Sequence, residues 1–161
     1  MSSSHLLFVS PCGKEQRPGM HEPADLYTGR LFELRRKAIK SLRTINRGPA
    51  FILSTRHGLI EPRGTKYAMY DAADRETSVE RVQAQAAAQG MLDAQVIAVA
   101  SIGDIAFLRE VFGHDQVVDM CREVIPDVRA GGAAVKPLAM AKYIADNPGR
   151  CSTYIKKPSP T

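Results

Sequence analysis

Short apolar runs that each end in a turn constrain the fold of this chain more than any other feature. The clearest is Ala50–Ser54, which continues into a loop that closes at Pro62. Similar runs at His5–Ser10 and Gln95–Ala100 predict two more buried strands, because a short apolar run bounded by turn residues is typical of a strand covered on both faces. A fourth strand is predicted at Val117–Met120.

Segments with helical periodicity separate these runs. Apolar residues recur every three or four positions over 26–45 and predict an amphipathic helix. Thr77 as N-cap and Glu80 fit a capping box that begins a second helix. Two more helices are predicted over 103–113, which Gly113 ends, and over 137–146, where a proline occupies the first turn.

Alternation of strands and helices favours an α/β fold. We expect a single three-layer domain over residues 1–150, built on a mostly parallel four-stranded sheet flanked by helices. Residues 151–161, which include Lys156 and Lys157, are predicted to be a mobile basic tail. At 161 residues the chain is long enough to bury a substantial core.

Charge and cysteine content limit the classes of partner and compartment. Lysine and arginine (22) exceed aspartate and glutamate (17), and the pI near 9.3 is typical both of nucleic-acid-binding domains and of many small soluble proteins. Cys12, Cys121 and Cys151 are far apart and form no CxxC pair, which indicates reduced thiols rather than a zinc site or disulfide framework. No membrane-spanning run or signal peptide is apparent, so a cytoplasmic protein is expected.

The polar face of the predicted helix over 26–45 is strongly basic. It is either an ordinary solvated helix face or a stripe that faces nucleic-acid phosphates. The candidate nucleic-acid-binding residues are Arg35, Arg36, Lys37 and Lys40.

Two further candidate segments lie near the first strand. Ser10, Cys12 and Lys14 follow its end, where a glycine-containing turn can offer N–H groups and a lysine to an anion, or can be an ordinary βα turn. The spacing is not that of a phosphate-binding Walker A loop. Asp25 either caps the basic helix or takes part in chemistry, and Tyr27 either stacks on a base or packs under the loop.

His57 follows the strand Ala50–Ser54 directly and is the histidine best placed for chemistry, because ligands of open α/β sheets bind beyond the carboxyl ends of strands. Histidine suits proton transfer near neutral pH, although a lone histidine is also a common structural residue. No second histidine has metal-ligand spacing, so no metal or cofactor is predicted. The chain has neither a Gly-x-Ser-x-Gly elbow nor a Gly-x-Gly-x-x-Gly fingerprint.

Three segments together resemble an uncharacterised bacterial and phage family catalogued as a domain of unknown function. They are the opening strand with SPCGK, the run DLYTGRLF (Asp25–Phe32) and the run FILSTRHGLIEP (Phe51–Pro62), followed by Tyr70 and Asp71. The same order is more distantly similar to the peroxide-stress protein YaaA and to one domain of archaeosine synthase. This resemblance implies a uracil-DNA-glycosylase-like α/β fold and an association with nucleic acid. The predicted substrate-binding residues on these segments are Ser10, Cys12, Lys14, Tyr27, Thr28, Gly29, Ser54, Gly58 and Tyr70.

The leading functional hypothesis is an N-glycosylase that acts on a modified or unusual base, with DNA a more probable partner than RNA. Such an enzyme needs cations for the backbone, a stacking aromatic, a carboxylate near the sugar and a donor for the departing base. Asp25 or Asp71 would orient water or balance the sugar cation, and His57 would assist the departure of the base.

Two alternatives remain open. The protein is either a non-catalytic DNA-binding or phage accessory domain that uses the same basic helix, or an enzyme of free nucleosides or nucleotides. In the latter case the Gly131-Gly132 turn would lie near the phosphate.

Overall fold

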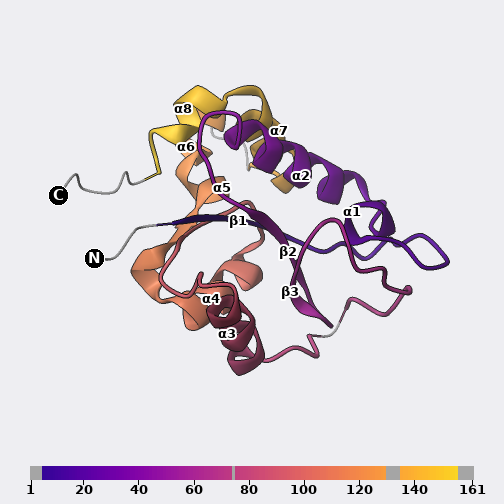
Figure 1. The fold of residues 1–161 in the computed structure, drawn as a ribbon. Helices are drawn as coiled ribbons and strands as arrows, with labels where there is room; N and C mark the ends of the chain where they lie inside the picture. The colour runs from indigo at the N-terminus through magenta and orange to yellow at the C-terminus, as the bar shows by residue number, and fades with distance from the viewer. Residues whose placement is uncertain (1–4, 74, 130–134, 156–161) are drawn as a thin grey trace.

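A five-stranded mixed sheet is the centre of the computed structural model, which describes residues 5–73, 75–129 and 135–155 (Figure 1). Its strand order is β3-β2-β1-β4-β5. Four of the strands are parallel, and β3 is antiparallel to β2. The strands are β1 (Leu6–Pro11), β2 (Ala50–Ser54), β3 (Gly58–Ile60), β4 (Gln95–Ala98) and β5 (Val117–Asp119).

The predicted α/β fold with helices flanking the sheet is confirmed, whereas the prediction of four strands is wrong. The additional strand, β3, pairs Ile60 with Ile52 and Gly58 with Ser54. It was missed because three residues after a tight turn give no periodic signal, and the segment reads as loop.

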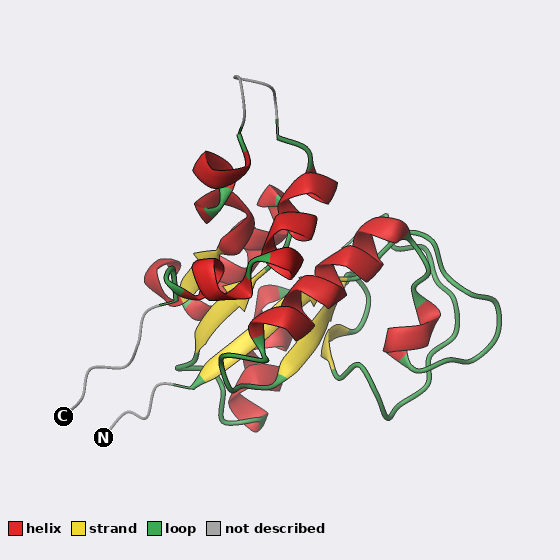
Figure 2. Cartoon of the chain, turned by 90° about the horizontal axis from the view of Figure 1, so that it is seen from above, coloured by secondary structure: helices red, strands yellow, loops and turns green. Residues whose placement is uncertain are grey.

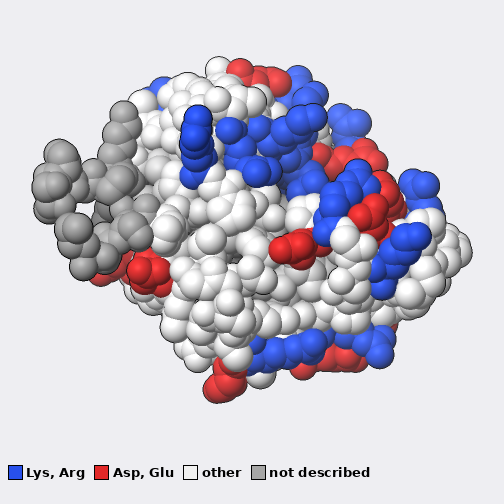
Figure 3. Space-filling model, viewed as in Figure 1, with Lys and Arg blue, Asp and Glu red and all other residues white. Residues whose placement is uncertain are grey.

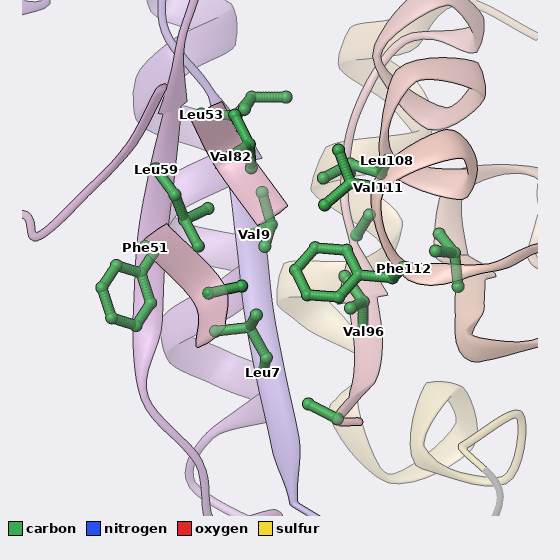
Figure 4. Close-up of a cluster of buried hydrophobic side chains, with 14 of the residues drawn as sticks. Leu7, Val9, Phe51, Leu53, Leu59, Val82, Val96, Leu108, Val111 and Phe112 are labelled. Carbon is green, nitrogen blue, oxygen red and sulfur yellow. The ribbon is translucent and has the colours of Figure 1, made fainter. Parts of the chain in front are cut away.

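One face of the sheet is covered by α3 (Val79–Ala88) and α4 (Ile102–Phe112). Side chains alternate along a strand, so Leu7 and Val9 of β1 point to this face while Phe8 points to the other. Figure 4 shows the resulting aliphatic layer, in which β-strand residues meet residues of both helices. Its labelled members are Leu7, Val9, Phe51, Leu53, Leu59, Val82, Val96, Leu108, Val111 and Phe112.

The opposite face is covered by α2 (Arg30–Leu42) and by helices from the last third of the chain. Leu42 of α2 and Ile144 of α7 are fully buried in this layer. Ser41 Oγ donates to the carbonyl of Ala145 at 2.7 Å and fixes α2 against α7. Ile45, predicted to be an inward residue of the same helix, is exposed because α2 ends three residues earlier. The later helices are α5 (Met120–Glu123), α6 (Ile125–Val128), α7 (Pro137–Asp146) and α8 (Pro148–Ser152).

Two predicted helix starts are shifted by one residue. The N-cap of α3 is Ser78, whose side chain accepts the N–H of Arg81, and not Thr77. Thr77 is held in the preceding loop because its N–H donates to the carbonyl of Thr55. Likewise α4 begins at Ile102, capped by the side chain of Ser101.

The packed part of the chain continues beyond the predicted boundary at residue 150. Cys151 and Ile155 are both buried against the α2 face. Lys156 and Lys157 of the predicted tail, and the Gly131-Gly132 turn, lie outside the described residues.

Long loops gather beyond one end of the sheet and form a third apolar cluster (Figure 2). One loop contains the short helix α1 (Pro23–Leu26) and the other follows β3. An isolated bridge of His21 with Tyr67 joins the two loops, and one of Gln16 with Tyr27 joins two parts of the first loop. The cluster consists of Leu26, Tyr27, Phe32, Ile52, Ile60 and Tyr70.

Candidate functional site

The carboxyl ends of β1 and β2 open into the loop region where the predicted site residues lie. β1 is central, with β2 on one side and β4 on the other, so the chain order reverses at β1. In open α/β sheets, ligands bind at such a switch point, just outside the strand ends. Cys12 follows β1 immediately, and its N–H donates to the carbonyl of Leu53 at 3.0 Å.

A buried chain of hydroxyl groups joins three of the predicted substrate-binding residues. Ser54 Oγ lies 2.7 Å from Tyr70 Oη, and Tyr70 Oη lies 2.5 Å from Tyr27 Oη. Burial raises the pKa of Tyr27 to about 12 and raises that of Tyr70 further. Both phenols therefore stay protonated at physiological pH.

The direction of these hydrogen bonds follows from the two N–H donors whose hydrogen bonds Ser54 Oγ already accepts. Its Oγ accepts the N–H groups of Arg56 at 3.2 Å and His57 at 3.0 Å, which uses both lone pairs. Ser54 must then donate to Tyr70, and Tyr70 must donate to Tyr27. The hydroxyl hydrogen of Tyr27 is left at the end of the chain as a donor.

His57 lies in the turn between β2 and β3, half-buried among aromatic rings. Its ring centroid is 4.3 Å from that of Tyr67 and 5.2 Å from that of Tyr70, which it meets edge-on. Burial lowers the pKa of His57, and the nearby charges of Arg56 and Arg81 lower it further. The imidazole is thus neutral near pH 7.

The backbone of this turn is held by Gln85 of α3. Gln85 Nε2 donates to the carbonyl of His57 at 2.9 Å, and Oε1 accepts the N–H of Leu59 at 2.8 Å. Gly58 has a φ of +79°, and a Cβ there would overlap the Gln85 side chain. Gly58 is therefore required by the turn that orients His57.

His57 lines a polar pocket of about 340 Å³ at the β3 edge. Sequence reasoning did not assign Glu61, Tyr67, Arg81 and Gln85 to this pocket. Glu61 directly follows β3 and is on the same side of that strand as Leu59, so recognition of the strand would have placed it along the pocket wall. The pocket is lined by Phe51, His57, Leu59, Ile60, Glu61, Thr65, Tyr67, Arg81, Gln85 and Gln89.

Two further hollows lie beside α2, and neighbouring hollows share lining residues from α2 to this pocket. The first, of about 410 Å³, shares Phe51 and Glu61 with the His57 pocket and also contains Arg36 and Arg43. The second, of about 390 Å³, lies along α2 and again contains Arg36 and Arg43. Figure 3 shows lysine and arginine side chains gathered over this part of the molecule. We call this path the cationic groove, formed by Arg36, Lys37, Lys40, Arg43 and Arg63.

The loop after β1 lines a separate and larger cavity of about 630 Å³. Cys12, Lys14 and Gly29, which are three of the predicted substrate-binding residues, all line this cavity. His57 does not line this cavity, so the structure divides the predicted constellation between two pockets. Ser10 is buried beneath the loop, and no hydrogen-bond partner of its hydroxyl is found among the described residues.

The two predicted catalytic aspartates make local contacts away from His57. Asp25 is in α1 and forms an ion pair of 2.6 Å with Arg63, so it does not cap α2. Asp71 is exposed and its carboxylate accepts the N–H of Ala73. Thr28 donates its N–H to the carbonyl of Glu15 and precedes the N-cap of α2.

The prediction that Arg35 lies on the basic outer face of its helix is wrong. Arg35 is only 8% exposed and points inward, because it falls on the same helical stripe as Ala38 and Leu42. Lys37 and Lys40 are exposed and Arg36 is half-buried, as an outer face requires.

Across the described parts of the chain, no cluster of three or more histidine, cysteine, aspartate or glutamate side chains is arranged to hold a metal ion. Within the same residues, every helix is too short or too polar to cross a bilayer.

A family model described as "Family of unknown function (DUF6884)" matches residues 6–110. The chain belongs to this family. The prediction of a family of unknown function is thereby confirmed, and the DUF6884 match includes every predicted site residue. Searches of curated proteins and of solved structures found no match. The more distant similarity to YaaA and archaeosine synthase stays a prediction.

Proposed function

We propose that this protein binds nucleic acid along the cationic groove and receives one base in the His57 pocket, where it hydrolyses the N-glycosidic bond of that base. The observation that carries the proposal is that neighbouring hollows share lining residues from the outer face of α2 to the pocket. Arg36 and Arg43 line both hollows on the α2 side, and Phe51 and Glu61 line both the first of these hollows, of about 410 Å³, and the pocket.

The groove supplies what a phosphate backbone needs. Lys37 and Lys40 are exposed, and Arg36 and Arg43 flank them along the same helix. Arg63 adds a fifth cation, although Asp25 and Glu22 offset part of its charge. A row of cations of this kind binds phosphates without reading sequence, and such binding weakens steeply with salt.

The pocket supplies contacts for an extruded base. Its volume of about 340 Å³ is near the lower limit for small-molecule sites and is compatible with a single base. Tyr67 offers a half-buried aromatic ring for stacking, and the side chains of Gln89 and Thr65 offer polar contacts to a base edge.

Two side chains of the pocket suit the hydrolysis. The bond between C1′ and the base nitrogen breaks, and its electron pair leaves with the base. Water adds to C1′ and its proton reaches the base, so the reaction needs no other reactant. Glu61 would orient and deprotonate the water, a role first expected of Asp25 or Asp71. The neutral imidazole of His57 would donate a hydrogen bond to the departing base.

The similarity to YaaA and to a uracil-DNA-glycosylase-like domain of archaeosine synthase supports the same class of function. It includes the segment from β2 through His57 to Pro62, which forms much of the pocket wall.

Reversing the groove charges should weaken DNA binding. We expect the double variant Lys37→Glu/Lys40→Glu to lose about tenfold or more in affinity and to show a salt slope shallower by about two, because two phosphate contacts are lost. Fluorescence anisotropy with a labelled duplex and a labelled single strand, each over a range of salt concentrations, measures both quantities. The control is Lys142→Glu, an exposed lysine of α7 outside the groove. Equal affinities for all three proteins would refute the groove.

The catalytic part of the proposal is tested with oligonucleotides that each carry one uracil, hypoxanthine or alkylated purine. We expect free base in solution and an alkali-labile abasic site with at least one of them. His57→Ala should abolish this product while changing the free energy of unfolding by less than about 2 kcal/mol. Salt-dependent binding without any abasic product would replace the proposal with a non-catalytic DNA-binding function. Base release from nucleosides but not from DNA would identify an enzyme of free nucleosides.

A further inference from the structure

The cavity beside the β1 loop has a polar end and an apolar wall. The loop after β1 and the first turn of α2 form the polar end, and the start of α7 closes the opposite side. Its volume of about 630 Å³ is within the range typical of small-molecule sites. The apolar wall consists of Leu31, Phe32, Pro137 and Leu138.

The first turn of α2 presents unpaired backbone donors at this polar end. The N-cap is Gly29, which has no side chain to cap the helix. Among the described residues, the N–H groups of Arg30, Leu31 and Phe32 have no hydrogen-bond partner. α2 has 13 residues, and the partial positive charge at its N-terminus adds to the attraction of these N–H groups for an anion.

Arg35, one turn further along α2, is a buried cation that lines the same cavity. It is more than nine-tenths buried, and its Nε has no hydrogen-bond partner within the described part of the chain. It forms no ion pair with any described residue. Burial lowers the pKa of Arg35, which reflects the cost of keeping this charge out of water. Asp104 attracts this charge without forming an ion pair with it, and a buried charge that lacks hydrogen-bonded pairing is destabilising unless a ligand compensates it.

We propose that this cavity binds the phosphate monoester of a mononucleotide-sized ligand. The α2 N–H groups and Arg35 contact the phosphate oxygens, and three exposed residues of the lining, Lys14, Arg30 and Lys136, add further positive charge. The apolar wall receives the non-phosphate part of the ligand. A dianionic phosphate matches this set because it has several acceptor oxygens and a charge that Arg35 compensates.

Glu15 is the one acidic residue of the cavity lining. Its carboxylate lies 3.8 Å from the position that a Cβ would take at Gly29, yet it accepts no hydrogen bond from the first turn of α2. Glu15 is exposed and therefore lowers the affinity for an anion without filling the site. Glu15→Gln should strengthen phosphate binding by about threefold, the usual scale for one exposed charge.

This site is independent of the proposed function. The lining of the cavity includes neither His57 nor any residue of the cationic groove. Failure of DNA binding or base release would leave the phosphate site untouched, and failure of phosphate binding would leave the groove untouched.

The test is calorimetric titration and thermal shift with orthophosphate, the four 5′-ribonucleoside monophosphates and the four nucleosides. We expect at least one monophosphate to bind about tenfold or more tightly than its nucleoside. Arg35→Met should reduce this difference while leaving the melting temperature equal or higher, because an apolar residue of similar volume tolerates burial better than an unpaired charge. Lys142→Met is the control and should bind as the unchanged protein does.

Equal binding of nucleosides and monophosphates by the unchanged protein would overturn the proposal. So would an Arg35→Met protein that prefers the monophosphate as strongly as the unchanged protein does. If Arg35→Met fails to fold, Glu15→Gln decides the question, since unchanged or weaker monophosphate binding by that variant would also overturn the proposal. The phosphate has two sources to distinguish, a free mononucleotide and the 5′ end of a nucleic-acid strand. If a strand end enters the cavity, a 5′-phosphorylated oligonucleotide should bind more tightly than the matching 5′-hydroxyl oligonucleotide.

Discussion

At the carboxyl end of β2, one serine hydroxyl determines how several neighbours are arranged. Ser54 accepts the N–H groups of two turn residues and donates to Tyr70, so the turn and the loop after β3 are linked through one oxygen atom. Ser54 is fully buried, which makes these bonds costly to lose. The position of His57 therefore depends on the Ser54 hydroxyl as well as on the contacts of its ring with Tyr67 and Tyr70.

The depressed pKa of His57 makes stability depend on pH. Its folded-state pKa lies below the ordinary value of about 6.5, so the unfolded chain binds more protons between these two values. The free energy of unfolding should therefore fall as the pH drops below about 6.5 and level off below the folded-state pKa. Urea unfolding at a series of pH values should give a smaller fall for His57→Gln than for the exposed-histidine variant His114→Gln. Identical slopes for the two variants would contradict the buried, neutral imidazole.

Several site residues could be predicted from the sequence because they follow recognisable strands. Cys12 and Ser54 lie where strand ends were expected, since the apolar runs of β1 and β2 are unambiguous. Glu61 and Arg81 could not be assigned to the His57 pocket, because their proximity depends on β3 turning back along β2 and on α3 packing beside it. Arg35 was misplaced because a charged residue in a basic run is ordinarily solvated.

At the scale of elements, the β2–β3 turn depends on the fit between Gly58 and Gln85. Gly58→Ala should destabilise the protein by about 2 kcal/mol, because it combines a positive φ with overlap on Gln85. Gly90→Ala is the matched control: its φ of +68° is similar, and a Cβ there meets nothing within 4 Å. Chemical denaturation should place Gly90→Ala between the unchanged protein and Gly58→Ala.

The double variant separates overlap from backbone strain. Gln85→Ala removes the overlap but also the hydrogen bonds to His57 and Leu59. The combined loss in Gly58→Ala/Gln85→Ala should be smaller than the sum of the single losses. If the two losses of stability were strictly additive, the methyl group that Gly58→Ala introduces and the Gln85 side chain would not compete for the same space.

Element types were more predictable than element boundaries. β2 was predicted with its observed bounds, whereas the N-cap of α3 was placed at Thr77 instead of Ser78. Both residue types are good caps, and in the structure it is the Ser78 side chain that accepts the N–H of Arg81. The short helices α1, α5, α6 and α8 give too few turns for a periodic pattern, so they depend on tertiary contacts.

At the scale of the whole molecule, the family match and the packed core do not coincide. The DUF6884 match ends at residue 110, but β5 follows it and extends the sheet, and helices α5–α8 pack on the same face of the sheet as α2. Met120 and Ile144 from this later region are fully buried against residues of the matched region. The start of α7 also forms one wall of the phosphate cavity.

Cysteine reactivity reports on this packing. Cys12 is half-buried, whereas Cys121 and Cys151 are fully buried, and burial raises the pKa of both, that of Cys151 to about 11. Iodoacetamide should therefore modify one thiol in the folded protein and three in denaturant, counted by mass spectrometry. Rapid modification of Cys151 without denaturant would mean that α8 detaches before the rest of the molecule unfolds.

The two edge strands of the sheet are its shortest, with three residues each in β3 and β5. A short edge exposes few unpaired N–H and C=O groups to another chain. The longer strands β1 and β2, which would be effective templates for aggregation, each have neighbours on both sides. The arrangement that brings His57 to the pocket, with β3 folded back along β2, thus also protects the sheet against edge-to-edge polymerisation.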